Sequence, residues 1–320
     1  MTSTAPAERS TRAAAGRATS VAPARRLRRR RALTGMLYAT PTAVFVGGLF
    51  VLPLLLVGWM SLHHWPLLGA PTLNAPDNYT AIGDEQLIRS ATWFTLKYTV
   101  IITVLLFVLS FGMALLVRGS GPARRFSGTG LLRGAYMLPM AVGFASASLL
   151  FLGLLSDEIG PVSDTLSALG LVHGYVSWTS GSPGSALGAN VVLVLWRFAG
   201  FNMLILLTGL QAIPTELYEA ARIDGAGRWA TFRRITVPLM RPTISLVLIL
   251  MVSGSLLAFD QFFILTRGGP DDSTTSLVMV VYRAAFVRLD LGGAAAISVL
   301  LLLAVLALNA IQLRFLRRED

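Results

Sequence analysis

The sequence predicts an all-α membrane protein that crosses the bilayer six times. Of its 320 residues 54% are hydrophobic and 13% are charged, and the mean hydropathy of +0.66 is typical of a polytopic membrane protein. Crossing the hydrocarbon core takes about 20 mostly apolar residues, because roughly 30 Å are covered at about 1.5 Å per residue. Six such windows are present, and the chain lacks the alternating ten-residue pattern of a membrane barrel.

The six windows are expected to be helices, and they follow one another along the chain. They lie at about residues 36–61, 93–117, 131–155, 190–212, 243–266 and 294–314. Pro41 and Pro53 should kink the first helix, and neighbouring helices can satisfy the carbonyl groups that such kinks free. Pro139 lies in the middle of the third window, which is the least regular of the six.

The distribution of basic residues orients the spans. Of 27 basic residues, 21 lie in four segments on one side, at residues 1–35, 118–133, 213–242 and 314–320. The three loops on the other side, at residues 62–92, 156–189 and 267–293, hold only four. Because basic loops stay in the cytoplasm, we expect a multi-pass protein of the cell membrane with both termini and the 213–242 loop in the cytoplasm. The net charge of +11 also attracts anionic lipid headgroups.

Residues 1–31 are expected to form a disordered, basic cytoplasmic tail ahead of one six-span domain at residues 32–320. The first 24 residues lack periodicity and are rich in Ala, Thr, Ser, Pro and Arg, and an arginine cluster follows. A cleaved signal peptide fits poorly, because the first apolar segment is long and has no small-residue cleavage site. No nucleic-acid partner is expected, since the cluster abuts a span and lacks interleaved aromatic residues.

The sequence offers no catalytic or metal-binding group of residues. Zero cysteines exclude disulfides, thiolate chemistry and zinc–cysteine sites. His63 and His64 lie beside Trp65 at the outer end of the first span, where an interfacial position is expected, and His173 stands alone in an outer loop. The only lysine, Lys97, has no glycines before it, so a phosphate-binding loop is absent. We therefore expect a non-enzymatic chain without a cofactor, and any ATP and Mg²⁺ must bind another protein.

The 213–242 loop has the sequence signals of two short helices. Pro214-Thr215 is a plausible helix start, and Glu216 and Glu219 would suit the positive end of that helix. Asp224-Gly225 is a credible stop, since glycine readily takes the left-handed conformation that ends helices. A second helix at about 228–236 would run into Pro238 and the fifth span. Small residues and a free carboxylate make the first helix a plausible docking surface for another protein.

The same loop resembles a known family. The run Glu219-Ala220-Ala221-Arg222-Ile223-Asp224-Gly225, with Ile235-Thr236-Val237-Pro238 further on, is similar to the EAA loop of permease subunits in binding-protein-dependent ABC importers. Val237 departs from the leucine usual there. The resemblance implies that Glu219, Ala220, Ala221, Asp224 and Gly225 couple the permease to an ATPase, whose closing rocks the membrane helices. The alternative is an ordinary cytoplasmic loop in which Ala and Glu merely favour helix.

Two further stretches resemble the carbohydrate-uptake branch of these permeases. They are residues 210–226, with Phe232, and residues 259–270, which contain aromatic residues followed by Leu265-Thr266-Arg267-Gly268-Gly269-Pro270. The second stretch is similar to the first of the two permeases in maltose-type and glycerol-3-phosphate-type systems. The resemblance covers about residues 30–317 and implies four partners: a second homologous permease, two ATPase copies and an extracytoplasmic solute-binding protein.

Polar residues within spans are the candidates for a solute path, because they are costly in lipid and usually face a cavity or a partner. The fourth window offers Trp196, Arg197 and Asn202, and the fifth offers Ser253, Ser255, Asp260 and Gln261. Aromatic faces can stack on a sugar ring and amides can bond its hydroxyls. Three alternatives remain open: Ser253 and Ser255 serve helix packing, Trp196 faces lipid or the partner, and Arg197 pairs with Asp260.

The sequence thus predicts the channel-forming subunit of an ATP-driven importer for a sugar or sugar-like solute. Glycerol-3-phosphate or another small polar solute is the alternative cargo. Two other classes stay open. A secondary transporter would need an intramembrane carboxylate relay, for which Asp260 is the one candidate, and a membrane scaffold or receptor would not need the Glu219 loop.

Overall fold

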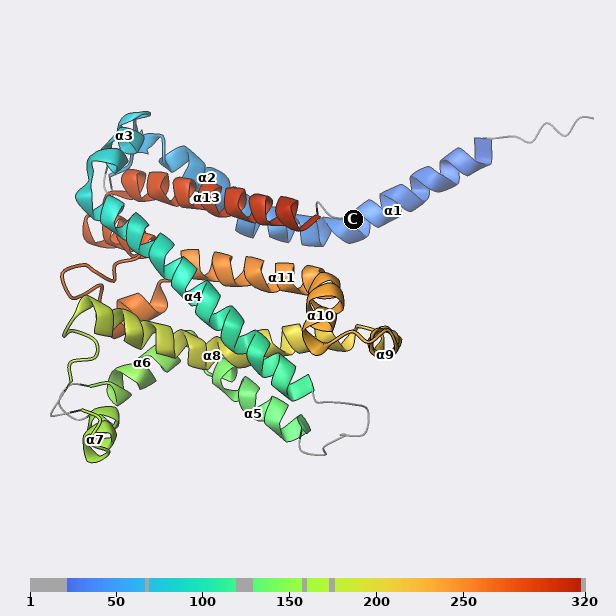
Figure 1. The fold of residues 1–320 in the computed structure, drawn as a ribbon. Helices are drawn as coiled ribbons and strands as arrows, with labels where there is room; N and C mark the ends of the chain where they lie inside the picture. The colour runs from blue at the N-terminus through green and yellow to red at the C-terminus, as the bar shows by residue number, and fades with distance from the viewer. Residues whose placement is uncertain (1–21, 67–68, 119–128, 157–159, 173–175, 318–320) are drawn as a thin grey trace, which may run out of the picture. The chain divides into compact units, whose positions relative to one another are not determined.

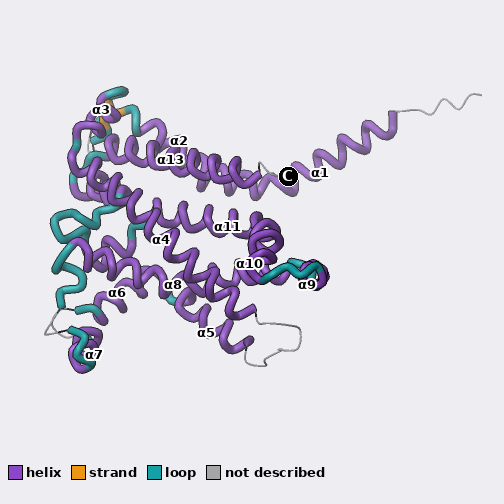
Figure 2. The backbone as a smooth tube through the Cα atoms, in the orientation of Figure 1, coloured by secondary structure: helices purple, strands orange, loops and turns teal. Residues whose placement is uncertain are grey.

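The computed structural model describes residues 22–66, 69–118, 129–156, 160–172 and 176–317, which are almost entirely helical (Figures 1 and 2). The chain divides into two compact units, residues 1–56 and residues 57–320.

One long helix in three parts begins in the first unit and ends just inside the second, at Met60. Helix α1 (Ala22–Val46) leads into a π-helical turn, η1 (Gly47–Val51), and α2 (Leu52–Met60) follows. The π turn ends two residues before Pro53, where it accommodates a ring that would clash with a carbonyl of the preceding turn. Because α1 begins at Ala22, the tail predicted for residues 1–31 is helical from residue 22, and residues 1–21 lie outside the described residues. Arginine, leucine and alanine are strong helix formers, so they extend the helix of the span.

The second unit contains every other element. The two short strands, β1 (His63–His64) and β2 (Thr72–Leu73), pair antiparallel with His63 opposite Leu73. The helices that follow are α3 (Asp77–Asp84), α4 (Gln86–Arg118), α5 (Thr129–Ala141), α6 (Phe144–Leu154), α7 (Pro161–Ala168), α8 (Pro183–Gln211), α9 (Thr215–Ile223), α10 (Arg228–Thr231), α11 (Val237–Leu256), α12 (Leu277–Tyr282) and α13 (Leu291–Arg317). Three π-helical turns interrupt them, η2 (Phe232–Thr236), η3 (Phe262–Thr266) and η4 (Arg283–Val287).

Five helices among the described residues are long and apolar enough to cross a membrane, and each overlaps a predicted window. They are Thr34–Met60, Gln86–Val117, Pro183–Gln211, Arg228–Leu256 and Leu291–Arg314. The fourth of them joins α10, η2 and α11, which confirms that the second helix of the 213–242 loop runs directly into the fifth span.

The third window, predicted as one span, is two helices. Helices α5 and α6 are bent by 94° at a short break, and the pair together is long and apolar enough to form a sixth span. Residue Gly143 at the break is extended, with φ of −54° and ψ of 145°. The carbonyl groups of Pro139, Met140 and Val142 that the break frees accept hydrogen bonds from Arg197. A residue 55 or more positions away therefore makes the break possible.

The fifth window also needs a correction, because its helix stops before the predicted end at residue 266. Helix α11 ends at Leu256, the chain is irregular at residues 258–259, and a short helical segment at 260–266 follows. The hydroxyl of Ser276 donates to the carbonyl oxygen of Ala258 over 2.7 Å and also accepts from the backbone N–H of Met279. This buried serine therefore provides a partner for a carbonyl group at the break and is also the N-cap of α12.

Helix α8 is the centre of the second unit and packs against α4, α5, α6 and α11 (Figure 1). Helices α5 and α6 contact different parts of it: Tyr136 of α5 lies against Gly200, whereas Phe151 of α6 lies in the same cluster as Ala189, nearer the start of α8. The main core gathers mostly around the second half of α8 and includes Met203, Leu206, Leu210 and Met240.

The two ends of this unit differ in charge. Helices α11 and α13 run antiparallel, because Leu256 clusters with Leu301 and Ser253 bonds to Asn309. The last turn of α13 therefore lies at the end of the unit that carries α9 and α10 (Figure 1). The second half of α4 reaches the same end, since Ala114 shares a cluster with Leu210. The described parts of three of the four arginine-rich segments thus lie at one end.

Candidate functional site

A cavity of about 270 Å³ lies between α4, α8 and α11 in the second unit. Four aromatic side chains line it, those of Tyr98, Phe144, Phe198 and Phe201. Aliphatic residues of α4, α8 and α11 complete most of the wall, and the lining among the described residues contains no charged side chain. Its volume is near the lower end of the range for small-molecule pockets, about 300 Å³.

Four polar side chains line the cavity: Tyr98, Asn202, Ser255 and Gln261. The amide nitrogen of Asn202 donates to the carbonyl oxygen of Phe198, and the hydroxyl of Ser255 donates to that of Val252. The amide nitrogen of Gln261 donates to the hydroxyl oxygen of Tyr98 over 3.2 Å. Its other amide atom, Oε1, is buried without a hydrogen-bond partner among the described residues. A buried acceptor without a partner is costly, and Gln261 is the lining residue that carries one.

Of the predicted solute-path residues, some line the cavity and others do not. Asn202 and Gln261 line it, but Trp196, Arg197 and Asp260 do not. Trp196 is 38% exposed and lies against Phe151 on a different face of α8, in a groove with Tyr136 and Pro139. The sequence did not identify four lining residues as candidates: Tyr98, Phe144, Phe198 and Phe201. Of these, only Tyr98 could have been recognised, because it is a polar aromatic residue in an apolar window.

Arg197 lies behind the cavity wall. Its guanidinium donates to the carbonyl oxygens of Pro139, Met140 and Val142, and it stands 5.1 Å from the ring centre of Phe144 and 5.2 Å from that of Phe198. The charge of Asp260 acts on Arg197 electrostatically, but within the described residues the two side chains form no ion pair at 4.0 Å or less. Ser253 bonds to Asn309 of α13, as expected for helix packing.

Helix α9 has the boundaries that the sequence predicts. It begins after Pro214 and ends at Ile223, with Asp224 as its C-cap. Gly225 adopts φ of +73°, its N–H bonds to the carbonyl of Arg222 at 3.1 Å, and the N–H of Ala226 bonds to that of Ala221 at 2.8 Å. These paired bonds are the Schellman ending, which requires a left-handed residue at the glycine position.

The residues of α9 and its end divide between an outer and an inner face. Glu219, Ala220, Asp224 and Gly225 are exposed, whereas Ala221 is buried. Ile223 is 86% exposed and Trp229 on α10 is 71% exposed. Four of the five predicted coupling residues therefore belong to an accessible surface that also carries large apolar side chains. Ala221 instead packs α9 against the rest of the unit.

Two contacts join α9 and its neighbours to the long helices. The hydroxyl groups of Tyr218 and Thr236 hydrogen-bond over 3.1 Å, which ties α9 to η2 at the start of the fifth span. A Cβ atom placed at Gly209 of α8 would lie 2.5 Å from the hydroxyl oxygen of Thr243 on α11, so these helices cross in close contact there. Helix α9 is therefore bonded to the segment that leads into α11, and α11 in turn packs closely on α8.

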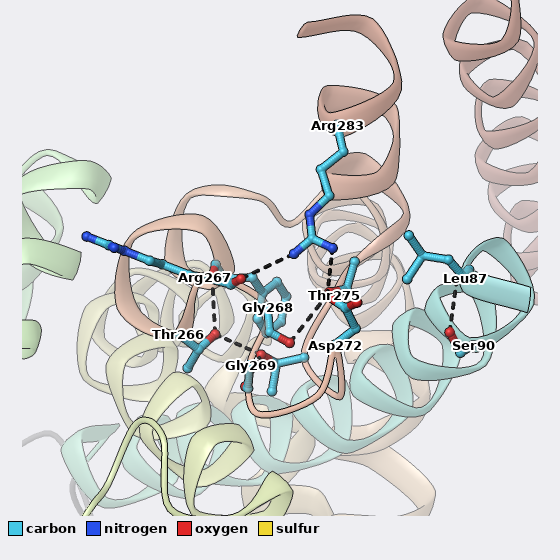
Figure 3. A network of polar contacts seen from close by, with 11 residues as sticks. Leu87, Ser90, Thr266, Arg267, Gly268, Gly269, Asp272, Thr275 and Arg283 are labelled. Atoms are coloured by element: carbon cyan, nitrogen blue, oxygen red, sulfur yellow. Dashed lines mark hydrogen bonds and ion pairs between the residues drawn. The ribbon is translucent and has the colours of Figure 1, made fainter. Parts of the chain in front are cut away.

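The Leu-Thr-x-Gly-Gly-Pro signature builds a closed loop after η3 (Figure 3). The Thr266 hydroxyl bonds to that of Thr274 over 2.8 Å, and Thr274 donates to the carbonyl of Gly269. Arg283 pairs with Asp272 at 2.6 Å, and its guanidinium also donates to the carbonyl of Arg267 (Figure 3). Gly268 has φ of +85°, so the glycine of the signature is required by the backbone.

Comparison with known proteins agrees with this architecture. Residues 119–320 match the family described as binding-protein-dependent transport system inner membrane component. The chain is 33% identical over 290 residues to the sulfoquinovosyl glycerol transport system permease protein of Agrobacterium fabrum, covering 90% of this chain and 92% of the relative. It is 32% identical over 296 residues to the trehalose/maltose transport system permease protein of Thermococcus litoralis, covering 90% and 95%.

A solved structure shares the fold. It is a chain of a bacterial ABC transporter involved in the import of the acidic polysaccharide alginate, with a TM-score of 0.77, 22% sequence identity and coverage of 92% of this chain and 99% of that chain. The chain therefore belongs to the family of inner membrane components of binding-protein-dependent transport systems. It is a permease subunit, and this membership favours import over the secondary-transporter and scaffold alternatives.

Proposed function

We propose that this permease forms half of the channel of an ATP-driven importer and passes a neutral sugar through the cavity between α4, α8 and α11. The single observation that carries the choice of cargo is the lining of the cavity. Aromatic faces, hydroxyls and amides suit the apolar faces and hydroxyl groups of a sugar ring. The unpartnered Oε1 of Gln261 is buried, and a turn of the side chain toward the cavity would let it accept from a sugar hydroxyl.

An anionic cargo such as glycerol-3-phosphate fits this lining less well. A desolvated phosphate needs a cation or several N–H donors. Arg197 is a cation near the cavity, but its Nη1 atom bonds to carbonyl groups and its guanidinium packs on Phe144 and Phe198, outside the lining. Two related permeases are named for sugar-containing solutes, and a third, 37% identical over 247 residues, is named for sn-glycerol-3-phosphate, so the choice of cargo rests on the lining and not on the names of relatives.

The proposal includes six spans, with α5 and α6 together as the third. Two observations support it: α5 and α6 both pack against α8, and the described parts of three arginine-rich segments lie at one end of the second unit. With six spans, the positive-inside rule places both termini and α9 in the cytoplasm.

The proposal also assigns α9 as the coupling helix. Glu219, Ala220, Asp224 and Gly225 form its accessible surface beside the exposed Ile223, and the bond of Tyr218 to Thr236 connects it to the start of the fifth span, whose helix α11 packs on α8 at Gly209. The partners would be two ATPase copies, which bind and hydrolyse ATP with Mg²⁺, a second homologous permease and an extracytoplasmic solute-binding protein. This chain itself would need no cofactor.

Uptake by the reconstituted complex tests the proposal. Proteoliposomes containing both permeases and the ATPases would receive the binding protein loaded with a labelled neutral sugar from a panel. We expect ATP-dependent uptake that Gln261→Leu reduces severalfold while basal ATPase activity stays unchanged. Uptake of none of the sugars, or undiminished uptake by the variant, would overturn the assignment.

A further inference from the structure

Arg197 is a charged residue within a membrane span, and the structure shows how its charge is used. A cation at such a depth is expensive unless it is paired or hydrogen-bonded. Arg197 finds its partners in the backbone at the break between α5 and α6: the carbonyl groups of Pro139 and Met140, each at 3.4 Å, and that of Val142. These carbonyls belong to the last turn of α5 and to the break itself, and that of Pro139 also accepts from the backbone N–H of Val142 at 3.3 Å.

The same guanidinium packs on the aromatic wall of the cavity. It lies 5.1 Å from the ring centre of Phe144, the first residue of α6, and 5.2 Å from that of Phe198. The two rings meet edge to face at 5.7 Å, and both line the cavity. Arg197 therefore contacts residues on both sides of the break and holds one wall ring against the other.

A second contact fixes α5 one turn further along α8. A Cβ atom placed at Gly200 would overlap the carbonyl oxygen of Tyr136, so the backbones of α5 and α8 touch there. That contact positions α5 but does not reach α6. In the described part of the chain, Arg197 is the side chain that bonds to the end of α5 and packs on the start of α6.

An arginine suits this position better than a lysine. Its three carbonyl bonds all leave the one nitrogen Nη1, so the planar group can lie against the rings of Phe144 and Phe198 while that nitrogen bonds to the backbone. A lysine ammonium would keep the charge and could bond to the carbonyls, but it has no planar group to pack on the two rings.

We propose that Arg197 is a positioning residue that sets the aromatic wall of the cavity: by clamping the break between α5 and α6 it fixes Phe144 against Phe198, without touching the solute. The inference rests on the proposed function, since it assumes that the cavity is the path of the solute. Arg197 then determines which solutes fit, acting through Phe144.

The shape of the cavity can be measured without knowing the solute. The chain has no native cysteine, so Ser255→Cys places a single thiol in the cavity. The probes are a small methanethiosulfonate and a bulky fluorescein maleimide, applied to the detergent-solubilised complex with cysteine-free partners. The ratio of their labelling rates reports the size of the opening, and Ser182→Cys, on the exposed loop before α8, is the control thiol.

We expect Arg197→Met to raise the relative rate of the bulky probe at Ser255→Cys severalfold and to leave the ratio at Ser182→Cys unchanged. Phe144→Leu should have a similar effect, and the double variant should be no worse than the stronger single variant, because the two residues act as one unit. Phe151→Leu, two turns along α6 and outside the cavity, should not change the ratio. Arg197→Lys should restore only part of the wild-type ratio.

The proposal would be overturned if Arg197→Met and Phe144→Leu changed the ratio of labelling rates independently, so that their effects multiplied in the double variant. It would also be overturned if Arg197→Lys kept the full wild-type ratio. If Arg197→Met fails to fold, the same cycle is measured with Arg197→Lys. Failure of the proposed function is seen separately, as undiminished uptake by Gln261→Leu in a protein whose labelling cycle behaves as expected.

Discussion

The amide nitrogen of Gln261 donates a hydrogen bond to the hydroxyl oxygen of Tyr98 over 3.2 Å, and this bond joins the segment after α11 to α4 at the wall of the cavity. Both side chains are at least 98% buried, and Tyr98 also lies between the rings of Phe94 and Phe262. A buried polar pair of this kind is stable only while both members are present.

The first prediction follows from that pair. Tyr98→Phe should destabilise the protein by about 1–3 kcal/mol, because the Gln261 amide keeps its burial and loses its acceptor. The double variant Tyr98→Phe with Gln261→Leu should lose less than the sum of the two single variants, since it leaves no orphaned polar group. Denaturant unfolding of the purified protein in detergent measures both effects. Strict additivity would show that the bond contributes little.

The second prediction concerns the contact between α5 and α8. Gly200→Ala forces a methyl group into the Tyr136 carbonyl and should destabilise the protein by about 1–3 kcal/mol, as overpacking does. Gly188→Ala is the matched control on the same helix, because a Cβ atom there has no neighbour within 4 Å. The two variants are compared by their thermal unfolding in detergent. Equal stability of both would mean that α5 does not touch α8 at Gly200.

The third prediction concerns the charge of α9. Glu219→Lys should abolish most ATP-dependent uptake while the protein stays in the membrane, because a like charge would meet the basic partner surface that we infer there. Asp164→Lys makes the same change in charge on the exposed surface of α7 and should leave assembly with the ATPases intact. Uptake assays, with co-purification of the ATPases, measure the effect. Normal uptake by Glu219→Lys would remove α9 from the coupling path.

The end of α9 gives a fourth prediction. Gly225 has φ of +73° and open space around it, so Gly225→Val would cost about 1–2 kcal/mol through the backbone alone. The Schellman bonds would be lost and α9 would fray, which should lower uptake. Gly227→Ala, at φ of −67° and also in open space, is the control and should transport normally. Equal uptake by both variants would contradict a role for the glycine.

Cysteine labelling tests the orientation. In intact cells, an impermeant reagent should label Ser182→Cys, which lies in the poorly basic loop at 156–189, but not Arg228→Cys at the start of α10. Lysed cells should label both positions, which shows that each thiol is reactive. Labelling of Arg228→Cys alone in intact cells would reverse the topology.

Several elements could be predicted because their signals are local. The second, fourth and sixth spans appear as apolar runs, and α9 is framed by Pro214 and Gly225 in the sequence. The breaks could not be predicted, because their carbonyl groups are satisfied by residues distant in the sequence. Arg197 satisfies the break in the third span, and Ser276 satisfies the break after α11.

The solute-path residues were predictable only in part for a related reason. Hydropathy identifies a polar residue in a span but not the face of the helix on which it lies. Asn202 and Gln261 face the cavity, whereas Trp196 is on another face of α8. Asp260, expected inside the fifth span, follows the end of α11 instead.

The central claim is that the solute passes through the cavity between α4, α8 and α11. The most direct measurement is uptake of a labelled neutral sugar by the reconstituted complex carrying Ser255→Cys as its only thiol, before and after complete reaction with a bulky maleimide. We predict that modification stops uptake and that the same modification at Ser182→Cys does not. Unchanged uptake by the fully modified Ser255→Cys protein would contradict the account and place the path elsewhere.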